Sequence, residues 1–108
     1  MTIIQKNGNI ITSIDIFTVE DSSKQQRLLD MLKDAIKQII SKHHGFISAT
    51  VHKSLDGTKV INYIQWQNKD AIEKILNDPK VLIHMNDVDQ IAKADRNLYE
   101  IDFVDEIG

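Results

Sequence analysis

Apolar and polar residues follow one another in a pattern that predicts strands near both ends of the chain. Residues 10–19 carry apolar side chains on both faces of an extended segment, which favours an interior strand of a sheet. One face would hold Ile10, Ile14 and Ile16, and the other Ile11, Phe17 and Val19. Residues 98–104 predict the last strand.

A long helix is predicted after the first strand. Asp21, Ser22 or Ser23 can cap its N-terminus, and apolar residues then recur at helical spacing to about His44. Gly45 stands where a left-handed residue commonly ends a helix. The inward face would consist of Leu28, Leu32, Ala35, Ile36, Ile39 and Ile40.

A second helical region is predicted in two parts. The first covers residues 68–76 and would turn Ala71, Ile72, Ile75 and Leu76 inward. Asp78 can cap the second part, with Pro79 at the first helical position, where a backbone N–H is not needed. The buried side of this part would hold Val81, Leu82, Met85, Val88, Ile91 and Ala92.

Residues 45–67 predict a β-hairpin between the two helical regions. Asp56 and Gly57 lie between runs rich in Ile, Val, Tyr and Thr, and a type I′ turn needs positive φ at both of its central residues. Leu55 would then pair with Thr58. Counting outward pairs Val51 with Asn62, Ala49 with Ile64 and Ile47 with Trp66.

This register sorts the hairpin side chains onto two faces, because successive side chains in a strand alternate. One face would carry Ile47, Ala49, Val51, Asn62, Ile64 and Trp66. The other would carry Phe46, Ser48, Thr50, His52, Tyr63 and Gln65. The first face is apolar except for one amide and one indole N–H, so we expect it to lie against the helices.

The predicted order β-α-β-β-α-β, with a broken second helix, is a ferredoxin-like α+β arrangement in a single domain over residues 1–108. Its helices cover only one face of the sheet. Phe46, Ile61 and Tyr63 on the other face are too apolar to remain in water. We therefore expect a homodimer in which two sheets pack together.

The charge and the composition of the chain limit the classes of molecule that it can bind. The formal net charge is −3, and lysine and arginine are scattered, which argues against nucleic acid or an anionic membrane as a partner. The chain has no cysteine, which excludes disulfides, thiolate metal sites and a cysteine nucleophile. Met1–Ile11 lacks the features of a signal peptide, and no apolar run reaches the roughly 18 residues of a membrane span. We expect a cytoplasmic protein.

The hairpin also resembles a known family. The residues that carry the resemblance are Gly45-Phe46, Ser48-Ala49-Thr50, His52, Ser54, Asp56-Gly57-Thr58, Asn62-Tyr63 and Gln65-Trp66, followed by Asp78-Pro79, His84-Met85 and the segment from Arg96 to Tyr99. With these anchors in order, nearly the whole chain resembles the antibiotic biosynthesis monooxygenase family, small oxygenases that work without a cofactor. The resemblance implies a dimeric α/β barrel.

The resemblance also implies a reaction. The matching asparagine and tryptophan are Asn62 and Trp66, which in the family line a pocket between sheet and helices. There a small phenolic, anthrone or quinol substrate reacts with O₂ to give a quinone, without metal or flavin. An electron-rich anion can reduce O₂ directly, so the protein has to stabilise the anion and the peroxide that follows. Asn62 would donate to the substrate oxyanion, and Trp66 would contact the ring or the peroxide.

Other pocket residues differ from the family pattern. Ile72 stands where well-known members have a tyrosine, and His84 or Met85 stands where they have an arginine. We predict His84 as a catalytic base with a pKa near neutrality. The predicted substrate-binding lining is Val51, Ile64, Ile72 and Met85.

Several alternatives remain open. Trp66 can be a core aromatic residue, and His84 a partly exposed helix histidine. In haem-degrading relatives a histidine after a comparable step binds haem iron, and here Asn77-Asp78 precedes His84. A third possibility is a dimeric ligand-binding or stress-associated protein without catalysis. The histidines lack the spacing of a metal site, and no phosphate loop or nucleophile elbow is present.

Overall fold

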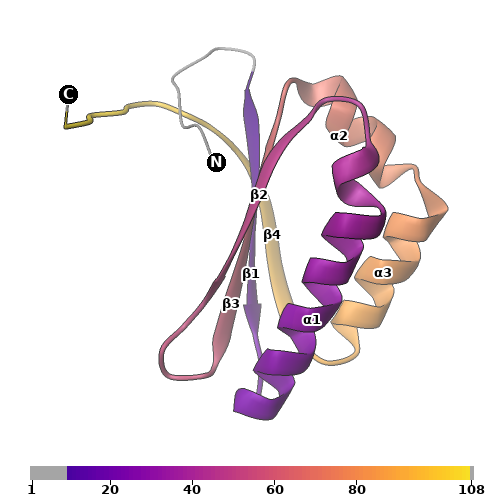
Figure 1. The fold of residues 1–108 in the computed structure, drawn as a ribbon, viewed down its shortest axis with the longest axis vertical. Helices are drawn as coiled ribbons and strands as arrows, with labels where there is room; N and C mark the ends of the chain where they lie inside the picture. The colour runs from indigo at the N-terminus through magenta and orange to yellow at the C-terminus, as the bar shows by residue number, and fades with distance from the viewer. Residues whose placement is uncertain (1–9, 108) are drawn as a thin grey trace.

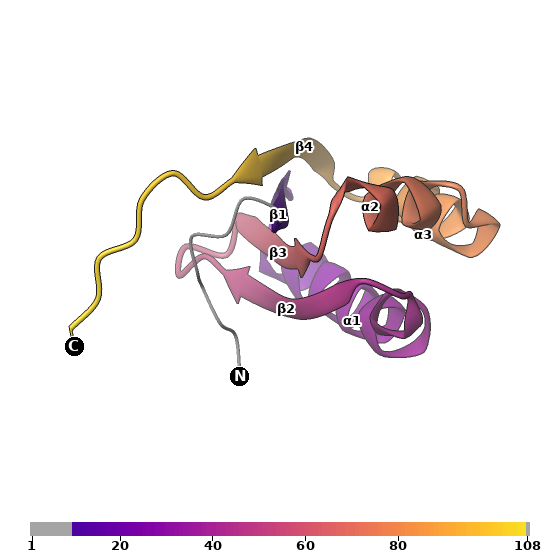
Figure 2. The ribbon, with the colours of Figure 1, turned by 90° about the horizontal axis from the view of Figure 1, so that it is seen from above.

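The computed structural model describes residues 10–107, which form an antiparallel sheet with helices on one face (Figures 1 and 2). The elements are β1 (Ile11–Thr18), α1 (Ser22–Gln38), the 3₁₀ turn η1 (Ile40–Lys42), β2 (Phe46–Lys53), β3 (Lys59–Trp66), α2 (Lys69–Leu76), α3 (Pro79–Asp89) and β4 (Lys93–Glu100). The strand order in this part of the chain is β2-β3-β1-β4. The predicted ferredoxin-like α+β arrangement is confirmed.

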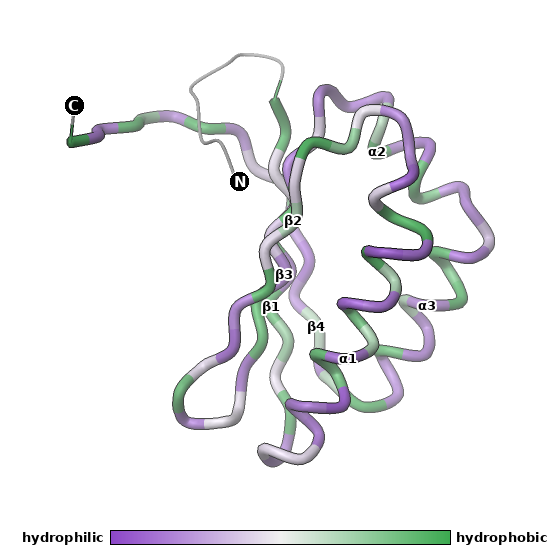
Figure 3. Tube along the Cα trace, in the orientation of Figure 1, coloured by the Kyte–Doolittle hydropathy of each residue, from purple (hydrophilic) through white to green (hydrophobic). Residues whose placement is uncertain are grey.

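Helix α1 begins where the sequence predicts but ends earlier. The Asp21 side chain accepts a hydrogen bond from the backbone N–H of Lys24 and caps the helix. The helix stops at Gln38, and the turn η1 then carries Ile40 into the core. The prediction that the helix reaches about His44 is therefore wrong. In Figure 3 hydrophobic positions recur turn by turn along α1.

Gly45 has the predicted positive φ, +93°, but it does not end α1. It precedes β2 and lies against α2, where a Cβ added to Gly45 would be 2.5 Å from the Cβ of Ala71. The residue therefore allows both an unusual backbone conformation and a close approach of two elements.

The hairpin register is confirmed in its middle and wrong at its outer end. Val51 pairs with Asn62 and Ala49 with Ile64, as predicted. A register shift between Phe46 and Ser48 then makes Phe46, not Ile47, the partner of Trp66. The two rings meet edge to face with centroids 5.8 Å apart, and Phe46 packs in the core on the helix side. Phe46 was predicted on the uncovered face, and the bulge explains the difference.

The hairpin turn differs from the predicted type I′ turn. Gly57 has a φ of +80°, but Asp56 has no positive φ. Residues 55–58 instead form a loop closed by a backbone bond from Ser54 N–H to the Lys59 carbonyl, 2.9 Å long. The Asp56 carboxylate accepts hydrogen bonds from Ser54 and Thr58, and these bonds lower its pKa to about 2. This loop has the same centre as the predicted turn, so the register is unchanged.

The remaining helices lie close to their predicted positions, and β4 is shifted. Asp78 caps α3 and Pro79 occupies its first position, as predicted, and the Asn68 side chain caps α2, a role that the sequence interpretation did not assign. Strand β4 lies about five residues earlier than predicted, because its pairing with β1 runs from Lys93 to Glu100. Among residues 10–107, no helix has the length and apolar character needed to cross a membrane. The leader-peptide argument for Met1–Ile11 falls mainly on residues 1–9, outside the described residues.

The helix-covered face of the sheet holds two apolar clusters. One centres on Trp66 and α2, with Ala35, Ile40, Ile64, Trp66, Ala71, Ile72, Ile75 and Val81. The other centres on α1 and β1, with Phe17, Val19, Leu28, Leu29, Leu32, Val60 and Val88. Residues of both clusters border the cavity described next.

Candidate active site

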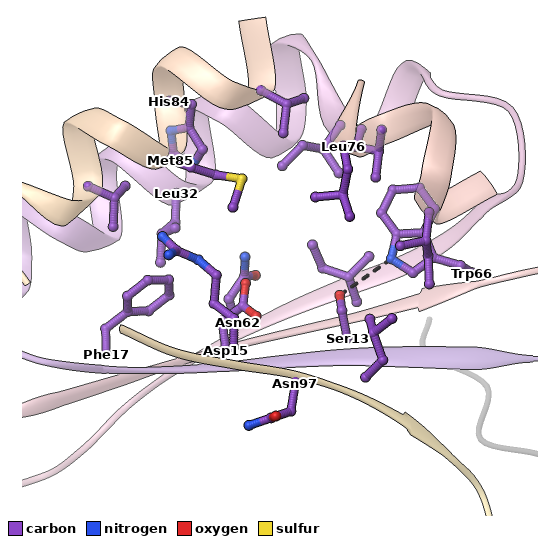
Figure 4. A pocket seen from close by; sticks show the side chains of 18 residues that line it. Ser13, Asp15, Phe17, Leu32, Asn62, Trp66, Leu76, His84, Met85 and Asn97 are labelled. Carbon is purple, nitrogen blue, oxygen red and sulfur yellow. Dashed lines mark hydrogen bonds between the residues drawn. The ribbon is translucent and has the colours of Figure 1, made fainter. Parts of the chain in front are cut away.

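A cavity of about 530 Å³ lies between the helix-covered face of the sheet and the three helices (Figure 4). Its size falls within the roughly 300 to 1,000 Å³ of small-molecule sites. The walls are mostly apolar, and the polar lining residues are Ser13, Asp15, Asn62, His84, Arg96 and Asn97. In Figure 4 the Asn97 side chain lies across the sheet from the others. The space can therefore hold an aromatic molecule and offers it few polar groups.

The polar groups nearest the centre form one row across three strands. Asp15 on β1 pairs with Asn62 on β3 and with Arg96 on β4. Residues opposite one another in adjacent antiparallel strands point to the same face, so all three face the helices. Figure 4 shows Asp15 and Asn62 side by side. Val51 extends the row on β2.

Asn62 lies in the cavity as predicted, with 4 % of its surface exposed. Its side-chain oxygen is buried and has no hydrogen-bond partner within residues 10–107. Leaving such an atom unpaired costs about 1 to 3 kcal/mol, so a ligand hydroxyl that donates a hydrogen bond to this oxygen would recover that free energy.

Trp66 also lies in the cavity wall, with 2 % of its surface exposed. Its indole N–H donates a hydrogen bond to the hydroxyl of Ser13, 3.3 Å away (Figure 4). The sequence did not indicate Ser13 as a partner. The indole is thus fixed in position, and its ring rather than its N–H is the part that is available to a ligand.

His84 on α3 lines the cavity from the helix side. It is half-buried, and burial is the main cause that lowers its pKa, with Arg96 adding to the effect. At neutral pH the imidazole is therefore uncharged. Met85, the next residue, projects into the same space (Figure 4).

Asp15 is the titratable group that the sequence interpretation missed. Burial raises its pKa from 3.8 to about 6, and the positive charge of Arg96 opposes part of that rise. The available signal was the alternation of β1, which places Asp15 on the same face as Phe17. A carboxylate on the covered face of an interior strand is unusual and indicates a function.

Arg96 is held in place by two contacts. Its guanidinium donates to both carboxylate oxygens of Asp89, at 2.8 and 3.4 Å. It also lies over the ring of Phe17, 5.7 Å from the ring centre. The guanidinium is therefore a fixed positive charge at the edge of the cavity.

The predicted lining residues are placed together with one exception. Ile64, Ile72 and Met85 border the cavity along with Asn62, Trp66 and His84. Val51 is on the expected face but packs against the cluster under α1 and does not border the cavity. It lies on β2, beyond Asn62 in the same row.

Comparison with known proteins adds three relatives. A curated protein named tetracenomycin-F1 monooxygenase from Streptomyces glaucescens is 33% identical over 86 residues, which is 80% of this chain and 76% of the relative. The structure of a point mutant of SnoaB, a cofactor-independent oxygenase from Streptomyces nogalater, has a TM-score of 0.81 at 16% identity. The structural match covers 90% of this chain and 97% of the SnoaB chain.

The third relative is a monooxygenase from the gene ActVA-Orf6 of Streptomyces coelicolor, solved with the ligand nanaomycin D. Its TM-score is 0.74 at 24% identity, over 91% of this chain and 94% of the other. The sequence pattern of one family matches residues 17–84, which include Asn62, Trp66 and His84. This match covers more than half of the chain, and the chain therefore belongs to the antibiotic biosynthesis monooxygenase family.

Proposed function

We propose that the protein is a monooxygenase that uses O₂, without a cofactor, to oxidise a phenolic, anthrone or quinol substrate to a quinone. The observation that carries this proposal is the largely apolar cavity with an unpartnered Asn62 amide oxygen in its floor, as far as residues 10–107 are concerned. Tetracenomycin-F1 monooxygenase, the curated relative, supports the same reaction class.

The reaction needs an electron-rich substrate anion and a dry place to form it. The apolar walls exclude water, which strengthens each electrostatic contact inside the cavity. Rotation of the Asn62 side chain can direct its NH₂ group at a substrate oxyanion. The fixed indole of Trp66 provides a flat surface for the aromatic rings. The substrate anion then supplies the electrons that reduce O₂.

Oxygen uptake tests this function. Metal-stripped protein would be mixed with anthrones, naphthols and quinols, and uptake would be corrected for autoxidation. We expect uptake that depends on the protein and falls about 100-fold in Asn62→Ala, because one oxyanion donor contributes about that much. Trp66→Phe should lower uptake less, since it keeps a ring.

The matched control is Asn86→Ala, which removes an exposed asparagine of α3 that does not line the cavity. Its uptake should equal that of the native protein. Equal uptake in Asn62→Ala would contradict the proposed role of the amide, and no uptake above background with any substrate would contradict the oxygenase function.

A homodimer is part of the proposal. Ile14, Ile16, Ile61 and Tyr63 lie on the sheet face opposite the helices and are only partly buried in one chain. A second sheet packed on this face would cover them. Light scattering at micromolar concentration should give the mass of two chains, and the mass of one chain would contradict the dimer.

Haem binding is the second candidate, favoured by one observation. The His84 imidazole borders the cavity and has no hydrogen-bond partner within residues 10–107. Titration with haemin should leave the Soret band unshifted if the oxygenase proposal holds. A shifted band that His84→Ala abolishes would favour haem instead. Tight binding of naphthols without uptake would favour a ligand-binding protein.

A further inference from the structure

We propose that the Asp15 carboxylate removes the acidic methylene proton of an anthrone-type substrate, so that this side chain, and not His84, is the base of the site. The proposal rests on the oxygenase function and specifies both its substrate class and its proton acceptor. It is carried by the place of Asp15 in the polar row on the cavity floor.

Asp15 is next to the amide that would hold the substrate oxygen. Asp15 and Asn62 are directly opposed on β1 and β3, so their Cβ atoms lie about 4.5 to 5.5 Å apart. In an anthrone the carbonyl oxygen and the acidic methylene lie on opposite sides of one six-membered ring. A ring whose oxygen meets Asn62 can therefore present its methylene to Asp15. His84 reaches the cavity from α3, on the opposite wall.

The Asp15 carboxylate is also free to react. It has no side-chain hydrogen-bond partner within residues 10–107, because the neighbouring Arg96 directs its guanidinium to Asp89. The charged or titratable groups around Asp15 are Arg96 on β4 and, on α3, His84 and Asp89. The lining residues from α1, α2 and β3 contain no titratable group.

The basicity of the Asp15 carboxylate suits the removal of the methylene proton. Burial raises its pKa to about 6, whereas Arg96 holds it below the value that burial alone would give. A base with a pKa just below neutral pH is mostly ionised and still accepts a proton effectively. Arg96 is thus a positioning residue that acts through Asp15.

The proton steps balance with O₂ as the oxidant. Asp15 takes the first methylene proton, and the electron pair of the broken C–H bond moves into the ring and carbonyl oxygen. O₂ adds at that carbon, where two electrons reduce it to a bound peroxide anion, which takes the proton back from Asp15. Asp15 then removes the second proton as the O–O bond breaks and C=O forms. The departing hydroxide takes that proton, so CH₂ and O₂ become C=O and H₂O.

Deuterium exchange under argon tests the first step without any oxygen chemistry. Anthrone in D₂O would be incubated with the protein, and loss of its methylene proton signal followed by NMR. We expect the native protein to accelerate exchange above buffer and Asp15→Asn to slow it about 100-fold or more, which is the usual contribution of a general base. The control Asp30→Asn removes a carboxylate that is 67% exposed on α1 and should exchange like the native protein.

The pH profile supplies a second measurement that does not need Asp15→Asn to fold. Exchange by the native protein should rise with a midpoint near pH 6, following the Asp15 pKa. Arg96→Gln removes a positive charge, so the midpoint should move to higher pH. If His84→Gln abolished the midpoint and Arg96→Gln left it unchanged, the base would be His84 and the proposal would be overturned.

Exchange and oxygen uptake separate the two proposals. Exchange that depends on Asp15 without any oxygen uptake would support Asp15 as the base and contradict the oxygenase function. Oxygen uptake that is unchanged in Asp15→Asn would keep the oxygenase function and overturn Asp15 as the base. Native protein that accelerates no exchange would overturn the role of Asp15 as well.

Discussion

The helix-covered face of the sheet has two halves that are packed differently. Under α1 the core is filled: Leu28 and Val60 are both 0 % exposed and do not border the cavity, and α1 lies directly on β2 and β3. Under α3 a cavity of about 530 Å³ remains, and the main contacts of α3 are with α1 and α2. The two halves therefore share one sheet but serve stability and ligand binding separately.

The difference follows from the residues on the strands. Apolar residues such as Phe17 and Val60 meet the leucines of α1 and interlock with them. Asp15, Asn62 and Arg96 offer polar groups instead, and between them and the α3 side chains His84 and Met85 the cavity remains. Polar groups on a covered sheet face thus keep a space open, at a cost in stability that the filled half has to offset.

The largest expected effect compares one core residue from each half. Leu28→Ala should lower the free energy of unfolding by about 3 to 4 kcal/mol, because Leu28 is fully buried and its removal leaves a void. Met85→Ala should cost less than about 1.5 kcal/mol, since Met85 already borders empty space. Urea denaturation of both variants measures the two values. Equal losses would mean that the two halves are packed alike.

Gly45→Ala should have the next largest effect, about 3 kcal/mol. It combines a φ of +93° with an added Cβ only 2.5 Å from that of Ala71 on α2, which forms one end of the cavity. Gly57→Ala is the matched control, at φ +80° with the nearest atom 3.2 Å away, and should cost about 1 to 2 kcal/mol. Thermal denaturation would compare them, and equal costs would show that the contact with α2 does not matter.

The sequence predicts the parts of this fold that depend on local signals. The cap Asp78, the start of α2 near Asn68 and the centre of the hairpin need only neighbouring residues to form, and all are placed correctly. The bulge before Ser48 depends instead on Phe46 meeting the ring of Trp66. Counting residues outward from the hairpin turn cannot predict such a contact, because the contact depends on how the core is filled.

The residues of the site also divide into those set by local signals and those set by contacts between distant segments. Asn62 and Trp66 could be identified because they lie in the hairpin, whose register the sequence predicts. Asp15 was missed: the alternation of β1 places it on the face of Phe17, but its neighbours come from β3 and β4 and depend on the pairing of distant strands. Val51 was placed on the correct face, but it packs against the cluster under α1 and does not border the cavity.

Asp15 should make stability depend on pH. Its pKa rises from 3.8 to about 6 on folding, so the folded chain binds this proton more tightly than the unfolded chain. Its contribution to the free energy of unfolding is full below about pH 4 and is lost as the pH rises through about 6, a change of about 3 kcal/mol, of which about 2 kcal/mol falls between pH 4.5 and 7.5. Urea titrations at pH 4.5 and 7.5 would measure it.

In Asp15→Asn this part of the pH dependence should disappear. The variant should gain stability relative to the native protein at pH 7.5 and gain little at pH 4.5. If the stability difference between Asp15→Asn and the native protein were the same at pH 4.5 and pH 7.5, the Asp15 carboxyl would not titrate in this range. The cavity half would then be more open to water than its lining indicates.

The smallest single effect is expected for Asn62, which we compare with a second buried amide in the other half. Gln25 on α1 is 7% exposed, and its NH₂ group donates to the carbonyls of Ser54 and Lys59 at 3.1 and 3.0 Å. Asn62 is 4 % exposed, and its oxygen has no partner within residues 10–107. Gln25→Leu should lower the free energy of unfolding by about 1 to 3 kcal/mol, because it removes two hydrogen bonds of about 0.5 to 1.5 kcal/mol each. Asn62→Leu should raise it by about 1 kcal/mol, because it removes an unpaired group beside a space that accepts the larger side chain, while oxygen uptake falls. If Asn62→Leu destabilised the protein as much as Gln25→Leu, the amide would have a structural partner, and the cavity half would be built for stability as well.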